Sequence, residues 1–137
     1  MVILIAILAG IAVALQGQFM ATTNRAAGTA TAVFITYGVG AAIAAVAWFV
    51  TRAPRSGSIP AYAWLAGPLG LVIVGGISFA APRLGLGRTL VITIAAQLAA
   101  ALLIDQFGFF GAVQRGFDVP RAIGFALTVA GVWLIVR

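Results

Sequence analysis

The sequence contains no cysteine, histidine, lysine or glutamate, and its ten charged residues are eight arginines and two aspartates. Charged residues make up 7% of the chain, against about 25% in soluble domains, whereas 64% of the residues are hydrophobic. So few polar groups cannot cover a soluble globule, which excludes a soluble enzyme, a disordered chain and a disulfide scaffold. Without histidine, cysteine or glutamate, Cys/His metal sites and Ser-His or Cys-His catalytic pairs cannot form. The composition predicts neither an enzyme nor a bound metal or cofactor.

The net charge of +6 suggests nucleic acid at first sight. The arginines do not cluster, however; most stand singly between long apolar runs. A phosphate-binding surface needs several basic side chains together, whereas single arginines are typical of the edges of a membrane. The sequence therefore predicts the lipid bilayer, and not nucleic acid, as the partner of these arginines.

The uncharged runs predict where the chain crosses the bilayer. A helix needs roughly 20 mostly apolar residues to do so, and three runs are longer than this. Two shorter runs, 89–104 and 122–136, reach this length if the arginine and aspartate side chains at their ends extend to the headgroups. We predict an all-α integral membrane protein with one membrane domain over residues 1–137 and five transmembrane helices, at 2–21, 28–50, 61–80, 86–106 and 119–136.

Local chemistry predicts the breaks between these helices. The run Thr-Thr-Asn-Arg at 22–25 is typical of a polar turn. The proline and serine residues within 54–60 are typical of a loop. Pro82 is predicted to end the third helix, because proline cannot continue the hydrogen-bond ladder. Asp118 and Pro120 are predicted to open the last helix, with the carboxylate near the positive end of the helix dipole.

The arginines are balanced across the five predicted helices. Arg52, Arg55, Arg115 and Arg121 fall on one side of the membrane, and Arg25, Arg83, Arg88 and Arg137 on the other. The positive-inside rule orients a protein by the difference between these counts, which here is zero. The balance favours dual topology, in which the chain inserts both ways and pairs antiparallel. The alternative is a weak bias that a partner or the N-terminus decides.

Five short helices enclose little space. A transport pathway normally lies between repeats related by a pseudo-two-fold axis in the membrane plane, and no internal repeat is visible in the 137 residues. An antiparallel dimer of ten helices would supply that symmetry. The second half would be another copy of the chain or an oppositely oriented paralogue.

Short motifs spread over nearly the whole chain carry a family resemblance. They are Ala9-Gly10, Leu15-Gln16, Asn24, the run Tyr-Ala-Trp-Leu-Ala-Gly-Pro-Leu-Gly at 62–70, Pro82-Arg83-Leu84-Gly85, Gln97-Leu98, Ile104-Asp105-Gln106-Phe107-Gly108 and Arg121 with Gly124 and Gly131. In their order and spacing, the sequence resembles the YdcZ-type family, a small branch of the drug/metabolite transporter superfamily. One departure is Ala96, where the family usually has glycine. The resemblance implies an inverted-repeat transporter in the bacterial inner (plasma) membrane, with an unspecified small-molecule substrate.

Polar side chains within the predicted spans are the candidate pathway residues, because such groups are costly in lipid unless they face protein or water. Gln97 lies near the middle of the fourth helix, one turn after Thr93 and two turns before Asp105. Gln97 and Thr93 are candidates for substrate contact, and a hydrogen bond across a helix interface is the alternative for Gln97. Asp105 is a candidate for proton coupling, or for an ion pair at the headgroups.

Four further candidates come from the first three helices and from the predicted turn between the first two. Gln16 lies on nearly the opposite face from Gln18 and has the better claim to the pathway, since the family pattern includes it. Asn24 is either a substrate contact or a turn residue. Tyr37 is a candidate for lining the pathway, and Trp64 for the pathway or for an interfacial aromatic belt. Pro68 would free the carbonyl of Trp64, as in the interrupted helices of transporters.

The lack of a carboxylate near the centre of any helix bears on the cargo. A pump for lipophilic cations usually needs such a counter-charge, so we predict a neutral or anionic small molecule, with Arg88 and Arg83 as possible anion contacts. The predicted function is transport by alternating access. The alternatives are a non-transport membrane subunit, such as an assembly or regulatory partner, and a lipid-flipping protein.

Overall fold

The computed structural model describes residues 1–51, 58–116 and 118–137. Its elements are α1 (Val2–Thr51), η1 (Ala61–Leu65), α2 (Ala66–Leu84), α3 (Leu86–Phe107), η2 (Phe109–Gly111) and α4 (Val119–Val136). No strand occurs in these three ranges. The chain divides into two compact units, Met1–Leu86 and Gly87–Arg137. Most of the loop predicted at 54–60 lies outside the described residues, as do Arg52 and Arg55.

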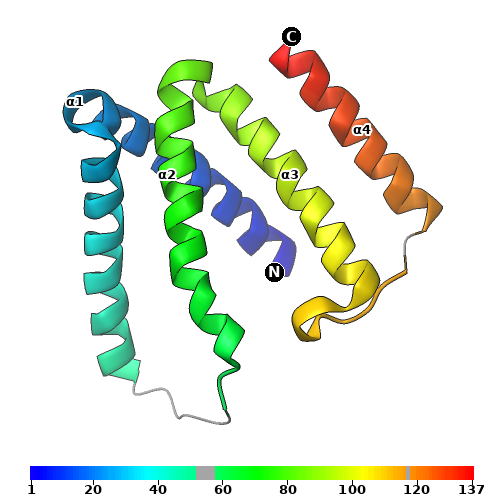
Figure 1. Cartoon of the computed structure of the whole chain (residues 1–137), viewed down its shortest axis with the longest axis horizontal. Helices are drawn as coiled ribbons and strands as arrows, with labels where there is room; N and C mark the ends of the chain where they lie inside the picture. The colour runs from blue at the N-terminus through cyan, green and yellow to red at the C-terminus, as the bar shows by residue number, and fades with distance from the viewer. Residues whose placement is uncertain (52–57, 117) are drawn as a thin grey trace. The chain divides into compact units, whose positions relative to one another are not determined.

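α1 is one element of 50 residues that bends sharply at Gly28. An unbroken helix of this size would be about 75 Å long, more than twice the thickness of a bilayer core. Gly28 has φ 85° and ψ 164°, a backbone conformation essentially restricted to glycine. The two arms, 2–27 and 29–51, therefore run in different directions (Figure 1). The helices predicted at 2–21 and 28–50 are joined in this one element.

The polar turn predicted at 22–25 is wrong, because these residues are helical. The hydroxyl groups of Thr22 and Thr23 each donate to the carbonyl four residues earlier, at 3.0 Å, and Arg25 Nε donates to the Ala21 carbonyl at 3.3 Å. Polar side chains that bond to their own helix are satisfied inside it. The chain turns three residues later, at the glycine.

The third predicted helix, 61–80, begins as the 3-10 helix η1 and continues as α2. Pro68 lies in the first turn of α2, so its missing N–H falls where the 3-10 helix gives way to the α-helix. Pro82 does not end the helix, contrary to the prediction. It lies in the last turn, where it removes a single ladder bond. α2 ends at Leu84, and the chain leaves the helix through Gly85, which has φ 86°.

The last two helices follow the sequence pattern closely. α3 covers Leu86–Phe107, one residue more than the predicted 86–106, and α4 covers the expected 119–136. The Asp118 carboxylate caps α4 by accepting a hydrogen bond from the Arg121 backbone N–H at 2.9 Å, and proline occupies the first turn. The predicted start signal of the last helix is therefore confirmed.

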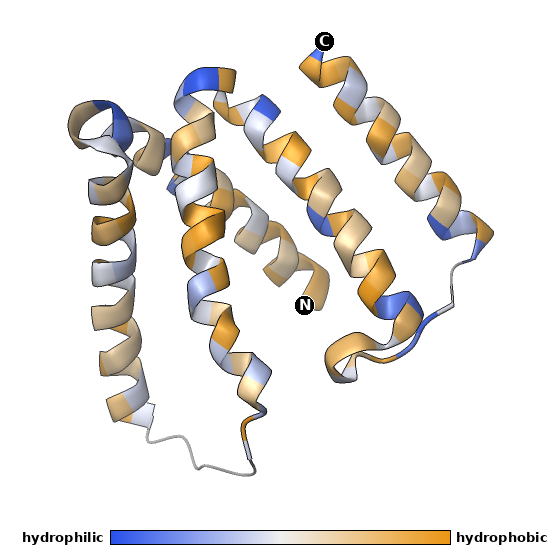
Figure 2. Ribbon diagram, in the orientation of Figure 1, coloured by the Kyte–Doolittle hydropathy of each residue, from blue (hydrophilic) through white to orange (hydrophobic). Residues whose placement is uncertain are grey.

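Four helical segments of the described chain are long and apolar enough to cross a membrane: α1, Ala61–Leu84, α3 and α4. Large apolar side chains are exposed along all of them, for example Leu4, Ile43, Val72 and Leu127. The most hydrophilic residues gather toward the helix ends and connections, with few along the helix bodies (Figure 2). Soluble proteins rarely expose so much contiguous apolar surface, so these helices are built to face lipid.

Candidate functional site

The second arm of α1 packs antiparallel against α2 within the first unit (Figure 1). Val33 lies opposite Gly75, where an added Cβ would be 3.8 Å from the valine methyl group, and Tyr37 lies opposite Gly70. The residue numbers rise on one helix as they fall on the other, as antiparallel packing requires. Glycine at both α2 positions lets the two backbones approach closely.

The Tyr37 hydroxyl occupies the space that a side chain at position 70 would need. A Cβ built on Gly70 would overlap the tyrosine Oη and lie 3.4 Å from the ring carbon that bears it. Gly70 therefore fixes where the hydroxyl can lie, and the half-buried Tyr37 is held across the α1–α2 contact.

A cavity of about 490 Å³ adjoins this contact. Its lining residues are Gln16, Thr36, Tyr37, Gly40, Ala41, Ala44, Gly70, Ile73 and Val74. They supply one amide and two hydroxyl groups against small and apolar side chains, and none of them is charged. The bend at Gly28 brings Gln16, from the first arm of α1, to the same cavity as Tyr37 from the second. Among the pathway residues predicted from the sequence, these two are brought together.

Asn24 forms a polar network at the bend. Its Nδ2 donates to Thr29 Oγ1 at 2.6 Å and to Ser78 Oγ at 3.3 Å. Ser78 is fully buried, among the few buried residues of this unit: Gly17, Met20, Ala21, Ala32, Ile77 and Ala81. Asn24 thus ties both sides of the Gly28 bend to α2.

Trp64 lies in η1 and is 73% exposed. It is not among the residues lining the cavity. A large exposed aromatic ring in a short segment just before a membrane-spanning helix suits the interfacial belt better than the cargo pathway.

The remaining candidates belong to α3, in the second unit. Gln97 is exposed, and the half-buried Thr93 donates its hydroxyl hydrogen to the Thr89 carbonyl at 2.8 Å. Arg88 is exposed in the first turn of α3, and Asp105 is half-buried in its last turn. The backbone carbonyl of Asp105 accepts a hydrogen bond from the Arg115 N–H at 2.8 Å, which folds the following segment back onto the end of α3.

Sequence reasoning missed three residues that the structure singles out. Ser78 and Thr29 complete the network of Asn24, and Gln106 has a buried side-chain oxygen without a hydrogen-bond partner among the residues described. A usable signal existed for Ser78, since a hydroxyl group in the middle of an apolar run is a polar group that must find a partner. Thr29 and Gln106 lie near predicted helix ends, where polar residues are ordinary.

Comparison with known proteins identifies the family. Residues 1–134 match the model of the family described as "Putative inner membrane exporter, YdcZ". No curated protein and no solved structure matches the chain. The match covers nearly the whole chain, so the chain belongs to this family, as its motifs predicted. Together with its membrane-spanning helices, this makes it a multi-pass protein of the inner membrane.

Proposed function

We propose that this member of the YdcZ exporter family is one half of a small-molecule exporter and binds its cargo in the cavity lined by Gln16, Thr36 and Tyr37. The observation that carries the proposal is the convergence of these three polar side chains from both arms of α1 on one cavity against α2. Ligand sites are typically concave and mostly apolar, with a few placed polar groups that fix orientation. The family supports export as the activity.

The lining favours an uncharged cargo. One amide can both donate and accept a hydrogen bond, and the two hydroxyl groups can do the same. None of the lining residues is a carboxylate that would neutralise a cation. A neutral molecule with a few polar groups on an apolar body fits this lining.

The proposed assembly is an antiparallel dimer in which each chain crosses the membrane five times. The arms of α1 measure about 39 Å and about 35 Å at 1.5 Å per residue, so each could cross a core of about 30 Å. Arg25 and Arg83 lie at the same end of the first unit, because Asn24 contacts Ser78 beside the bend. This agrees with placing both arginines on one side in the arginine count.

In an inverted dimer, alternating access would move one chain's helices against the other's around a central site. The cavity in each first unit would then open to opposite sides in turn. A second copy is the simplest partner, and an oppositely oriented paralogue would serve the same geometry.

A transport panel tests the cargo site. Cells expressing the wild-type chain, Gln16→Leu or Gln18→Leu would be loaded with neutral, anionic and cationic dyes or drugs, and efflux would be timed. Gln18→Leu is the matched control, since the same substitution two residues away falls on nearly the opposite face of the helix. We expect faster efflux of a neutral or anionic compound with the wild type and the control, and its loss with Gln16→Leu. Efflux restricted to lipophilic cations would contradict the proposed cargo class.

A reporter fused after Arg137 tests the assembly. Signal from both sides of the membrane is the result expected for dual topology and a self-paired dimer. Signal from one side alone would contradict the homodimer and require an oppositely oriented partner chain. Equal loss of efflux in Gln16→Leu and Gln18→Leu would contradict the site while leaving the assembly to be judged by the reporter.

A further inference from the structure

A second concave feature lies within the second unit, between α3 and α4. It is a groove of about 500 Å³ lined by Ala99, Leu102, Leu103, Gln106 and Phe107 of α3 and by Phe125 of α4. Five of these six side chains are apolar. In a bilayer, such a groove takes a hydrocarbon chain more readily than water.

Gln106 is the polar exception in the groove. Its side-chain oxygen Oε1 is buried and accepts no hydrogen bond from the residues described. A buried acceptor without a donor is unfavourable, and the last torsion of a glutamine side chain is soft enough for the amide to turn toward a ligand. The backbone carbonyl of Gln106 is already used, by Gln114 Nε2 at 3.1 Å. The side-chain oxygen is therefore suited to a ligand that carries an O–H or N–H donor.

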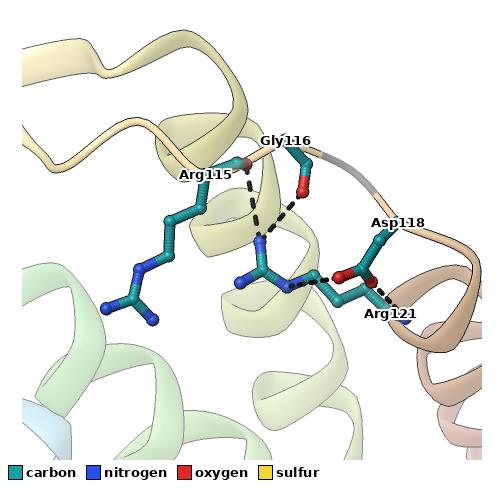
Figure 3. A network of polar contacts seen from close by, with 4 residues as sticks. All are labelled: Arg115, Gly116, Asp118 and Arg121. Atoms are coloured by element: carbon teal, nitrogen blue, oxygen red, sulfur yellow. Dashed lines mark hydrogen bonds and ion pairs between the residues drawn. The ribbon is translucent and has the colours of Figure 1, made fainter.

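A cationic side chain lies close to the same end of α3. The backbone N–H of Arg115 bonds to the carbonyl of Asp105, the residue before Gln106, so Arg115 is fixed beside the helix end. Arg115 is exposed, and its side chain points away from the neighbouring polar network (Figure 3).

That network occupies Arg121, in the first turn of α4. Arg121 donates to the carbonyls of Arg115 and Gly116 at 3.4 and 3.1 Å, and its Nε lies 3.9 Å from the Asp118 carboxylate (Figure 3). The Arg115 guanidinium forms no hydrogen bond or ion pair with the other three residues drawn there. Arg115 can therefore meet a phosphate without giving up a contact to this network.

We propose that this groove binds a phospholipid with a hydroxyl-bearing anionic headgroup, phosphatidylglycerol being the simplest. One acyl chain lies between α3 and α4 over Leu103 and Phe125, the phosphate meets Arg115, and a headgroup hydroxyl donates to Gln106 Oε1. The position of Gln106 in the last turn of α3 places the polar contact at headgroup level. A choline headgroup has neither an O–H nor an N–H donor, so it leaves the amide oxygen unpaired.

Native mass spectrometry of the purified chain in detergent tests this site, with phosphatidylglycerol and phosphatidylcholine of identical acyl chains as probes. The wild type is expected to retain phosphatidylglycerol more strongly. Gln106→Leu removes one hydrogen bond and is expected to weaken that retention by about 3- to 10-fold, and Arg115→Gln by a similar factor. Gln18→Leu and Arg137→Gln, the same substitutions away from the groove, are expected to change it less than 2-fold. Equal retention of the two lipids by the wild type would overturn the proposal.

A labelling experiment tests the groove without altering Gln106. The chain has no cysteine, so Leu103→Cys gives one fluorophore site inside the groove. Phosphatidylglycerol with brominated acyl chains is expected to quench this label more than brominated phosphatidylcholine does. Lipid-independent disulfide dimers through the cysteine at position 103 would show that a second copy fills the groove, and would overturn the lipid assignment, as would equal quenching by both lipids.

Discussion

The contact between Tyr37 and Gly70 allows a sharp test of the site geometry. Gly70→Ala places a methyl group where the tyrosine hydroxyl lies, so either the ring must leave its position or α1 and α2 must separate. Inserting a methyl group into a filled contact typically costs about 1–3 kcal/mol. We expect Gly70→Ala to lower the free energy of unfolding by this amount and to abolish efflux of any cargo that uses Tyr37.

The second half of this test is a rescue. Tyr37→Phe removes the hydroxyl oxygen and leaves the ring carbon at 3.4 Å from the new methyl group, an ordinary contact. In the double variant, the two substitutions should therefore cost less than their sum, with a coupling of about 0.5–3 kcal/mol. Export should not recover, because the hydroxyl that faces the cavity is absent.

The measurement is denaturation of purified chains in mixed micelles by sodium dodecyl sulfate, followed by helical circular dichroism. Gly76→Ala is the matched control, since a Cβ at that position on the same helix meets nothing within 4 Å. If Gly70→Ala unfolds at the same detergent fraction as Gly76→Ala, or if no coupling with Tyr37→Phe is measured, the packing of Tyr37 on Gly70 is refuted.

Three other substitutions give expected outcomes in the same unfolding assay. Gly28→Ala forces a side chain into a glycine-only conformation and should lower the free energy of unfolding by about 1–3 kcal/mol. Gly38→Ala, in open space within α1, should not lower it. Equal stability of the two variants would contradict the bend at Gly28. Asn24→Ala removes both bonds of the network and should cost about 0.6–2 kcal/mol, while Thr22→Val, which loses only a bond within the helix, should cost less. Asp118→Ala should lower the free energy of unfolding by about 0.5–2 kcal/mol, and Asp118→Asn by much less, because asparagine still caps the helix. An equal decrease in both variants would show that the ion pair with Arg121, and not the cap, stabilises this end of α4.

Composition and run length predicted an all-helical membrane protein, because lipid imposes one dominant constraint. Every backbone polar group in the bilayer core must bond within its own segment, so long uncharged runs predict helices almost regardless of their detailed sequence. This is why α3 and α4 begin and end within one residue of their expected ranges. The same reasoning identified Asp118 as a cap, because a cap is a local property that sequence alone can specify.

The errors in the predicted helix boundaries arose at polar and proline residues that a helix can accommodate. The threonines at 22 and 23 looked like turn residues, yet both hydroxyl groups bond within the helix. Pro82 looked like a helix end, yet a proline in the last turn removes only a single bond. In both places the actual break is a glycine with positive φ, at 28 and 85. Sequence gives no direct sign of this, because glycines also occur at many positions inside the helices.

The candidate site was predictable in its residue types but not in its grouping. Gln16 and Tyr37 stood out as polar groups in apolar runs, and the structure places both on one cavity. Their meeting depends on the direction in which the chain turns at Gly28, which is a tertiary property. Asn24 was singled out for the same reason as Gln16, but it bonds to Ser78 and Thr29 at the bend. A polar group in a membrane helix therefore indicates a partner, and the fold shows which of these groups have a partner within the protein.

Asn24 has hydrogen-bond partners within the protein, whereas Gln16 lines a cavity, so we expect the two residues to have different roles in an exporter. The amide of Asn24 has protein hydroxyl partners, so it can hold the bend in place through a transport cycle. Gln16 is exposed at a cavity whose other polar groups are hydroxyls. If this cavity is the cargo site, as we propose, the Gln16 amide is available to exchange partners as cargo enters and leaves. Substitution of Asn24 should therefore change stability and transport of every cargo together. Substitution of Gln16 should change the transport of some cargos more than that of others and leave the free energy of unfolding unchanged. An equal loss of stability in the Asn24 and Gln16 variants would show that Gln16 has a structural role as well.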